Sequence, residues 1–391
     1  MKRPYVFLLI TFMVAVSVLF GGWLVASQGS TGLPVVGLLD RGQPATESSA
    51  EIRTTSPDSG MTDEAPAPPD RSVEPPTTMM PTPSPAATST PGIDLAKVQP
   101  NELGTVPIIE YHIISDENGR WSRSRETFRQ DLERWYNAGF RTISMSDYLD
   151  NRIDLPPGLS PLVITFDDSS PGQLTFIKEG DELKPDPNCA VAILEEFVRE
   201  HPDFGLNATF FVLPAADPPH DLFGQKEYQK QKLEYIVQKG MEIGNHTFWH
   251  QILVDLDDEE VVRQIGQANK IITDFVPGYR VRAFALPLGE WPPNRSLVTS
   301  GVWEGVSYQH DAVFLAGAQP APAPTRNDYD PLAIPRVQII DETMEYWMEE
   351  LQSNKDRRYV SDGDPNTITF PERLSSLLNP AAAAGKKVVK Y

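Results

Sequence analysis

The chain has 391 residues, a formal net charge of −20 at pH 7 and a single cysteine, Cys189. One cysteine excludes an intrachain disulfide and a cluster of thiolate metal ligands. The excess of acidic residues argues against a nucleic acid partner, because nucleic acid binding depends on lysine and arginine that neutralise phosphates. A neutral or basic polymer fits this charge better. We expect Cys189 to be a buried structural residue, because it begins the apolar pattern of a helix.

The N-terminus carries a long apolar segment. Residues 1–4 form a short tip with Lys2 and Arg3, and residues 5–26 contain no charged side chain. Such a run is long enough to cross about 30 Å of hydrocarbon as a helix, and the basic tip favours a cytoplasmic N-terminus. The alternative is a cleaved signal peptide, but the run exceeds the ~7–15 residues of the usual apolar region. We therefore predict a single-pass anchor in the cell membrane with the rest of the chain outside the cytoplasm, or a secreted protein if the segment is cleaved.

Residues 27–103 have a different composition. No Phe, Tyr or Trp occurs between Leu24 and Glu110, and proline, serine, threonine and alanine are frequent. Such a segment cannot bury enough apolar surface to offset the entropy of ordering its backbone. We predict a disordered stalk that holds the following domain away from the membrane.

Residues 104–391 alternate short β-rich runs with helical patterns, which indicates an α/β fold with a mostly parallel sheet. Six or seven such units suggest a distorted (β/α) barrel, whose active site would lie at the carboxyl ends of the strands. We expect Asp255 to cap the last of the predicted helices. The predicted strands are 106–111, 162–166, 208–212, 241–245, 283–286 and 312–315, and the predicted helices are 125–137, 190–200, 228–239 and 259–275.

Ionisable residues follow several of these predicted strands. His112 ends the first apolar run, Asp167 and Asp168 follow the second, and His246 and His250 follow the run at 241–244. A fourth histidine, His310, lies beside the predicted strand at 312–315. So many ionisable groups at strand ends are typical of a functional site rather than of packing.

His246 and His250 are spaced so that one helical turn would direct both imidazoles at a common cation. The pair alone is weak evidence, since two histidines on a helix often have no ligand. Asp167 and Asp168 strengthen the evidence for a metal site, because two adjacent carboxylates can have two different roles. One ligates the metal, and the other accepts a proton from a metal-activated water. A solvated turn is the alternative for this pair, but the apolar residues 164–166 before it indicate an emerging buried strand.

These residues belong to segments that resemble the motifs of the NodB-homology polysaccharide deacetylases, also called carbohydrate esterase family 4. Ile164–Asp168 and Asn245–His250 are similar to the first two signature motifs of that family. Phe284–Gly289 is similar to a variant of the third, and Val106–His112 resembles an opening segment that is common in the family. The resemblance covers residues 104–350 and includes the segment 364–369.

The resemblance implies a distorted barrel of about seven units that binds a divalent metal, with Zn²⁺ as the expected ion. It implies that Asp168, His246 and His250 are the metal ligands and that Asp167 is the general base. A water would attack an acetyl carbonyl. Acetate would be released, and an amine or a hydroxyl group would remain on the sugar.

The sequence departs from the family pattern in three places. Residues 169–172 lengthen the turn after Asp168, where the family usually has glycine. The arginine that usually pairs with the base is missing from the third motif, and Arg282 or Arg336 is a candidate replacement. The late histidine that usually acts as general acid is missing too, which leaves His310 as a candidate.

Aromatic residues near the motifs are candidates for sugar binding, since their faces suit the CH groups of pyranose rings. Trp249 lies between the two histidine ligands and Trp291 follows the third motif. Tyr111 and His112, from the opening segment, are further candidate substrate contacts.

We therefore expect an exported hydrolase that removes acetyl groups from an N-acetylated cell-wall or extracellular polysaccharide. One alternative is an O-acetyl esterase, whose better leaving group needs less help from a general acid. Another is a catalytically silent glycan-binding domain. Retention of Asp167 beside all three ligand positions argues against the silent domain, because binding alone needs no base.

Overall fold

The computed structural model describes residues 93–215 and 221–391. The predicted tip and anchor, residues 1–26, and residues 27–92 of the predicted stalk lie outside this described part. Within it, no helix combines the length and the apolar character needed to cross a membrane.

The described residues fold around one sheet whose neighbouring strands are all parallel. Its strands are β2 (Ile108–Tyr111), β5 (Phe140–Thr142), β6 (Ser160–Asp167), β9 (Thr209–Val212), β10 (Glu242–Asn245), β11 (Ala283–Ala285), β14 (Ala312–Phe314) and β16 (Val337–Gln338). They follow the spatial order β14–β11–β10–β9–β6–β2–β16, and β5 lies beside the first half of β6. All eight residues of β6 are buried, as expected for a parallel strand that is covered on both faces.

The two edges of this sheet are joined by the segment 331–338. Ile334 forms a parallel bridge with Phe314 of β14, and three residues later Val337 pairs with Ile109 of β2. The sheet is therefore curled, and the predicted α/β architecture is confirmed. This segment also brings Arg336 to the centre of the molecule, where its side chain is 1% exposed.

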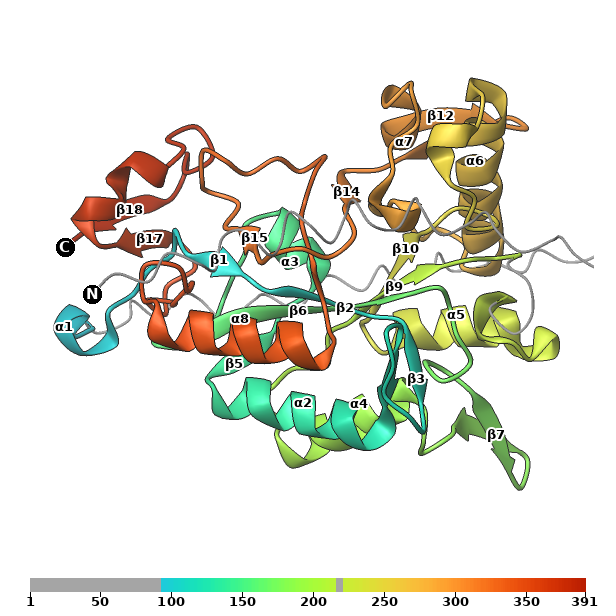
Figure 1. The fold of residues 1–391 in the computed structure, drawn as a ribbon, viewed down its shortest axis with the longest axis horizontal. Helices are drawn as coiled ribbons and strands as arrows, with labels where there is room; N and C mark the ends of the chain where they lie inside the picture. Colours follow the sequence, from blue (N-terminus) through green and yellow to red (C-terminus); the bar gives the residue numbers. More distant parts are fainter. Residues whose placement is uncertain (1–92, 216–220) are drawn as a thin grey trace, which may run out of the picture. The chain divides into compact units, whose positions relative to one another are not determined.

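Helices cover the sheet from outside. They are α1 (Leu95–Val98), α2 (Arg125–Asn137), α3 (Met145–Leu149), α4 (Ala190–Glu200), α5 (Gln229–Gln238), α6 (Asp258–Phe275), α7 (Ser296–Thr299) and α8 (Asp341–Ser353). Figure 1 shows α2, α4 and α8 together on one side of the strands and α6 with α7 on the other. Each long helix buries an apolar stripe, as α2 does with Phe128, Leu132 and Trp135 at helical spacing.

The predicted helices at 125–137 and 190–200 are confirmed with the same bounds. The predicted cap of the helix at 259–275 is wrong. Asp255 ends a short 3₁₀ turn, and Asp257 caps α6 by accepting a hydrogen bond from the backbone N–H of Glu260. Cys189 is buried, as expected, and precedes α4.

Short elements lie around this framework. The strand pairs are β1 (Thr105–Val106) with β15 (Ala321–Pro322), β3 (Ile113–Ser115) with β4 (Ser122–Ser124), β7 (Phe176–Glu179) with β8 (Glu182–Pro185), β12 (Ser300–Trp303) with β13 (Val306–Gln309), and β17 (Thr367–Phe370) with β18 (Lys387–Lys390). The 3₁₀ turns are η1 (Asp221–Phe223), η2 (Lys226–Tyr228), η3 (Leu253–Asp255), η4 (Pro287–Gly289) and η5 (Glu372–Leu377).

The folded part begins earlier than residue 104, where the sequence placed the end of the stalk. Asn101, Glu102 and Leu103 are buried. Asn101 forms an antiparallel bridge with Val360, and the backbone N–H of Glu102 donates to the carbonyl of Thr369. The order of polar and apolar residues here does not indicate a strand or a helix. Only their pairing with the C-terminal segment shows that they belong to the domain.

Candidate metal and catalytic site

A cavity of about 310 Å³ lies at the carboxyl ends of the central strands. Side chains at the ends of β2, β6 and β10 form its polar wall, and Leu286, Leu288 and Ala316 form an apolar wall. Arg336, from the segment that joins the sheet edges, closes the base of the cavity. The expected position of the site, where loops from several parallel strands meet, is the position observed.

Asp168, His246 and His250 converge in this cavity. Oδ1 of Asp168 lies 3.3 Å from Nε2 of His246 and 3.5 Å from Nε2 of His250. The same Oδ1 is buried and has no hydrogen-bond partner among the described residues. Two imidazoles and one carboxylate are a donor set that suits a catalytic Zn²⁺ with an open coordination position. The three residues therefore fit the divalent ion that the sequence motifs imply.

The orientation of His246 is fixed by its other ring nitrogen. Nδ1 lies 2.8 Å from the carbonyl oxygen of Ala285 in β11. If Nδ1 carries the proton, it donates to this carbonyl, and the lone pair of Nε2 faces Asp168 and is free for a metal.

His250 reaches the site from a turn and not from a helix, so the predicted helical turn is wrong. Thr247 and His250 have φ values of 73° and 53°, which a helix does not allow. The hydroxyl of Thr247 accepts from the backbone N–H of His250 at 2.9 Å, and its own N–H donates to Asn245 at 2.8 Å. These bonds stabilise the turn that brings the second imidazole back over the first.

The lengthened turn after Asp168 is held by its own side chains. Asp168 and Ser169 both have a left-handed backbone, with φ of 73° and 50°, a conformation that costs about 1–3 kcal/mol for residues other than glycine. The Ser169 hydroxyl accepts from the N–H of Leu213 at 2.7 Å. Gln173 donates to the carbonyls of Asp167 and His112 at 2.5 and 2.6 Å. The turn thus positions Asp168 without the usual glycine.

Asp167 is paired with Arg336, one of the two arginines that the sequence offered. Nη1 and Nη2 of Arg336 each lie 2.7 Å from one carboxylate oxygen of Asp167, a bidentate arrangement that fixes the carboxylate plane. Burial alone would raise the pKa of Asp167, but the charges of Arg336 and His246 hold it below its usual value. Asp167 is therefore an ionised carboxylate suited to accept a proton.

Glu110 adds a third carboxylate to the site. It is 3% exposed, its Oε2 lies 3.5 Å from Nε of Arg336, and its Oε1 lies 3.4 Å from Nε2 of His112. Burial raises the pKa of Glu110, and the charge of Asp167 adds to this while Arg336 opposes it. Glu110, His112 and Asp167 form a second group of potential metal ligands. Arg336 already supplies a cation beside both carboxylates, so a second metal ion is not needed there.

The two histidines of this group differ in their affinity for protons. Burial lowers the pKa of His250 to about 4, and the charge of His246 acts in the same direction. Burial also acts to lower the pKa of His246, but Asp167 and Asp168 outweigh it and raise the pKa. A cation bound at Asp168 would compete with the proton on His246, so metal binding is expected to release protons.

Three of the predicted contacts do not line the cavity. Tyr111 points to the other side of β2, where it is buried and its hydroxyl donates to Asp131 at 3.1 Å. Trp249 is 47% exposed on the surface turn between His246 and His250. Trp291 is half-buried and packs under the guanidinium of Arg295, 4.9 Å from the ring centroid.

His310 is also outside the cavity, so the structure does not support it as the general acid. It precedes β14, at the amino end of the sheet, and its Nδ1 lies 2.7 Å from the carbonyl oxygen of Val298. Its ring packs 5.2 Å from that of Phe284, and burial lowers its pKa to about 4. His310 is therefore a core residue that packs against the rings of Phe284 and Tyr308 at the amino end of β14, away from the cavity.

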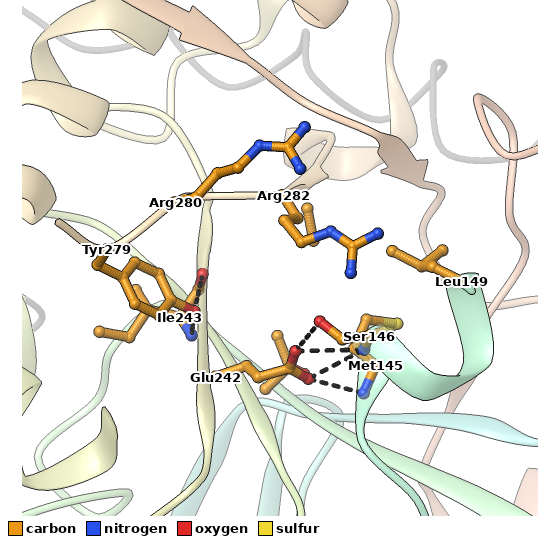
Figure 2. A pocket seen from close by; sticks show the side chains of 10 residues that line it. Met145, Ser146, Leu149, Glu242, Ile243, Tyr279, Arg280 and Arg282 are labelled. Atoms are coloured by element: carbon orange, nitrogen blue, oxygen red, sulfur yellow. Dashed lines mark hydrogen bonds between the residues drawn. The ribbon is translucent and has the colours of Figure 1, made fainter. Parts of the chain in front are cut away.

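Arg282, the other candidate partner of the base, lies at a second and smaller cavity of about 110 Å³. Figure 2 shows Arg282 and Arg280 lining this cavity opposite Glu242, whose carboxylate accepts hydrogen bonds from the backbone N–H groups at the start of α3. Arg282 itself pairs with Asp150 at 2.6 Å and with Asp311 at 2.7 Å. Glu242 begins β10, so this cavity is at the amino ends of the strands, opposite the candidate site.

Sequence reasoning missed Glu110 and Trp121, which both line the cavity. Glu110 could have been found from strand alternation, because residues 110 and 112 of an extended strand face the same side. Trp121 belongs to the excursion between β3 and β4, and its ring lies 4.9 Å from that of His112. The sequence contains no signal for that contact, because it depends on how the excursion folds back.

The fold and this group of residues define a hydrolase-type site built on a curled parallel sheet. Residues 156–300 match the family model described as polysaccharide deacetylase. The chain therefore contains a polysaccharide deacetylase domain, and the family that the sequence motifs indicated is confirmed. Glu110, His112 and Arg336 complete the site from outside the matched residues.

Solved structures of deacetylases show partial similarity to this chain. One is the Streptococcus pyogenes deacetylase PplD in complex with acetate, with 17% identity, a TM-score of 0.46, and coverage of 63% of this chain and 97% of that chain. Another is IcaB from Ammonifex degensii, with 18% identity, a TM-score of 0.45, and coverage of 63% and 96%. A putative polysaccharide deacetylase from Bacillus anthracis has 16% identity, a TM-score of 0.46, and coverage of 63% and 68%.

Proposed function

We propose that this protein hydrolyses acetamide groups of an N-acetylated cell-wall or extracellular polysaccharide, with a divalent ion, most suitably Zn²⁺, held by Asp168, His246 and His250. The observation that carries the proposal is the position of Asp167. This ionised carboxylate lies beside the three ligand residues, and Oδ2 of Asp167 is 3.7 Å from Nε2 of His246. A domain that only binds glycan has no use for a base in this place.

When bound, the ion would polarise the acetyl carbonyl and make a water more acidic. Asp167 accepts a proton from the attacking water, and Arg336 keeps the carboxylate ionised and oriented. His112 lines the same cavity and is the imidazole available to protonate the departing nitrogen. It therefore takes the role that the sequence gave to His310.

The rim of the cavity supports a carbohydrate substrate. Trp121 and Leu288 both line it and are 42% and 53% exposed. Exposed apolar side chains beside a polar cavity are suited to the CH faces of sugar rings, while the polar groups receive the acetyl group.

An O-acetyl esterase is the second candidate, and the absence of a histidine after His310 in the sequence favours it. An alkoxide leaves more readily than an amine anion, so an ester needs less proton donation. The presence of His112 in the cavity favours the amide reaction.

We also propose that the domain works outside the cytoplasm. The uncharged segment at residues 5–26 would anchor it in the cell membrane, and the stalk would let it reach the polymer. Protease protection in intact cells tests this: cleavage of the domain by added protease is expected, and complete protection would refute export.

Acetate release tests the proposed reaction. The full-length chain, purified in detergent and loaded with zinc, should release acetate from N-acetylglucosamine oligomers. Chelation and Asp167→Asn should each abolish most of this release. Release only from O-acetylated xylan would establish the esterase instead. Absence of release from both substrates, with zinc still bound, would show a binding domain.

A further inference from the structure

An exposed apolar segment accompanies the turn that carries His250, and the proposed chemistry does not use it. Trp249, Ile252 and Val254 are 47%, 37% and 45% exposed. They are three of the ten large apolar side chains that are exposed among residues 93–215 and 221–391, although they lie within six consecutive residues. Single exposed apolar residues are normal on a protein surface, but a cluster of them is typical of a surface that binds a partner.

The segment is held rigidly beside the cavity. The backbone N–H of Trp249 donates to the buried side chain of Gln264 at 3.0 Å, and Gln264 in turn donates to Glu260 at 2.9 Å. Leu253 is fully buried in one cluster with Leu286, which belongs to the apolar wall of the cavity. The exposed side chains therefore lie on a backbone that α6 and the cavity wall fix, so a ligand that contacts them has little backbone to order.

The segment also continues the surface of the cavity. His250 lines the cavity, and Trp249 precedes it directly in the chain. When the acetyl group of one sugar in a polymer enters the cavity, the neighbouring sugars must lie on the surface around it. The face of the indole suits the CH groups of such a neighbouring ring, and Ile252 and Val254 follow in the same segment.

The charge that follows the segment decides which partner fits. Residues 249–262 contain five carboxylates and no lysine or arginine. Asp257 caps α6, and Asp258 and Glu259 suit its first turn, so the acidic run alone indicates no site. Its sign nevertheless repels an anionic lipid surface and a second copy of the same segment. It attracts ammonium groups, and deacetylation of an N-acetylated polymer creates them.

We propose that the segment 249–254 is a docking surface for a partly deacetylated stretch of the substrate polymer. This inference rests on the proposed deacetylation. Trp249 contacts a sugar ring next to the reacting residue, and the carboxylates after the segment attract free amines of the same chain. The enzyme thus works beside residues that it has already deacetylated, and a long chain with free amines is a better substrate than a short or fully acetylated one.

Chain length and acetylation separate this role from a structural one. The test measures kcat/KM per acetyl group for acetate release from an N-acetylglucosamine dimer, a fully acetylated hexamer and a hexamer that carries some free amines. The proteins are the zinc-loaded full-length chain, Trp249→Ala, the double variant Asp255→Asn with Glu259→Gln, and Tyr346→Ala, each checked for bound zinc and for its unfolding midpoint. Tyr346 is the matched control, because it is 52% exposed on α8, on the other side of the strands from α6 (Figure 1).

We expect Trp249→Ala to lower the ratio of hexamer to dimer efficiency by about tenfold, as for an aromatic anchor of a binding surface. The double variant should lose the preference for the amine-bearing hexamer, and added salt should weaken this preference in the wild-type chain. Tyr346→Ala should keep both ratios. Equal losses on all substrates in Trp249→Ala, or an unchanged amine preference in the double variant, would overturn the inference.

Direct binding distinguishes failure of the surface from failure of the proposed reaction. Calorimetric titration of the metal-free full-length chain with the amine-bearing hexamer should show binding that Trp249→Ala weakens by about tenfold. If this binding is seen but no substrate releases acetate, the proposed reaction fails and the segment remains a glycan-binding surface. If the wild-type chain deacetylates dimer and hexamers with equal efficiency, the reaction stands and the docking surface is wrong.

Other occupants of the surface give different results. A change of oligomeric state in Trp249→Ala, with unchanged substrate ratios, would assign the surface to a second copy of the chain. A blue shift of tryptophan emission in lipid vesicles that only Trp249→Ala loses, again with unchanged ratios, would assign it to a membrane. Either result would overturn the inference.

Discussion

Replacing Arg336 by methionine tests the charge arrangement at the base of the site. The guanidinium is 1% exposed and forms two bonds of 2.7 Å to Asp167. Glu110 lies 3.5 Å from its Nε. Arg336→Met has a similar length but no charge, so it leaves two buried carboxylates close to each other without a cation.

Removing one partner of a buried ion pair costs about 3–5 kcal/mol, because the remaining charge stays desolvated. We therefore expect Arg336→Met to lower the free energy of unfolding of the metal-free protein by this amount at pH 7. The loss should be smaller at pH 5, where the two carboxylates can share a proton. Acetate release should fall by about 10²-fold or more, since Asp167 loses its orientation and part of its charge.

Arg282→Met is the matched control. Its guanidinium also pairs with two carboxylates, Asp150 and Asp311, but its side chain is 24% exposed and lies at the amino ends of the strands. Partly exposed pairs of this kind contribute about 1 kcal/mol or less each. Urea unfolding of both variants at pH 5 and 7, with acetate assays, gives the comparison. If the two variants unfold at the same urea concentration and retain equal activity, the assigned role of Arg336 is wrong.

Three further outcomes follow from the structure. Zinc at 100 times its dissociation constant should stabilise the wild-type chain by about 2.7 kcal/mol in thermal or urea unfolding; Asp168→Asn should lose most of this gain, and an equal gain in the variant would place the metal elsewhere. Burial lowers the pKa of His310 to about 4, below the ~6.5 of an unfolded histidine, so the wild-type protein should lose up to about 3 kcal/mol as the pH falls from 6.5 to 4. Unfolding of His310→Leu over this range should show a shallower pH slope, and an unchanged slope would contradict the burial argument. A Cβ at Gly172 would lie 1.8 Å from the carbonyl oxygen of Ile114, so Gly172→Ala should distort the turn that carries Asp168 and weaken zinc binding in a competition assay. Gly180→Ala is the control for backbone strain alone, because Gly180 has a φ of +64° but its Cβ would meet no atom within 4 Å; equal zinc affinity in both variants would refute the clash.

The elements that the sequence predicted best are those with a strong local pattern. The bounds of α2 and α4 could be predicted from the spacing of their apolar residues, because each helix buries one stripe of apolar side chains. The residue before each helix has an extended backbone. β6 was evident from its apolar run before Asp167. The short strands β5 and β16 and the helix α8 were missed. β5 and β16 hold only three and two residues, too few to show a period.

The candidate site shows the same division. Asp168, His246 and His250 were predicted because they lie in recognisable segments at strand ends, and one potential ligand atom of each lies within 4.8 Å of those of the other two. The sequence could not decide between Arg282 and Arg336 as the partner of Asp167, since each lies beside a short apolar run. The segment 331–338 decides it, because it crosses from β14 to β2 and carries Arg336 to the carboxyl end of the sheet.

The sequence by itself thus determined the family, the α/β architecture and the metal-ligand candidates, since these depend on local motifs and periodicity. Only the tertiary structure decided which residues complete the site. It moved His310 into the core at the amino end of β14 and joined Glu110, His112 and Arg336 in one polar cluster that lines the cavity. Such a cluster depends on which side of a strand each residue faces and on how distant segments close the sheet, and neither is encoded in any short stretch of the chain.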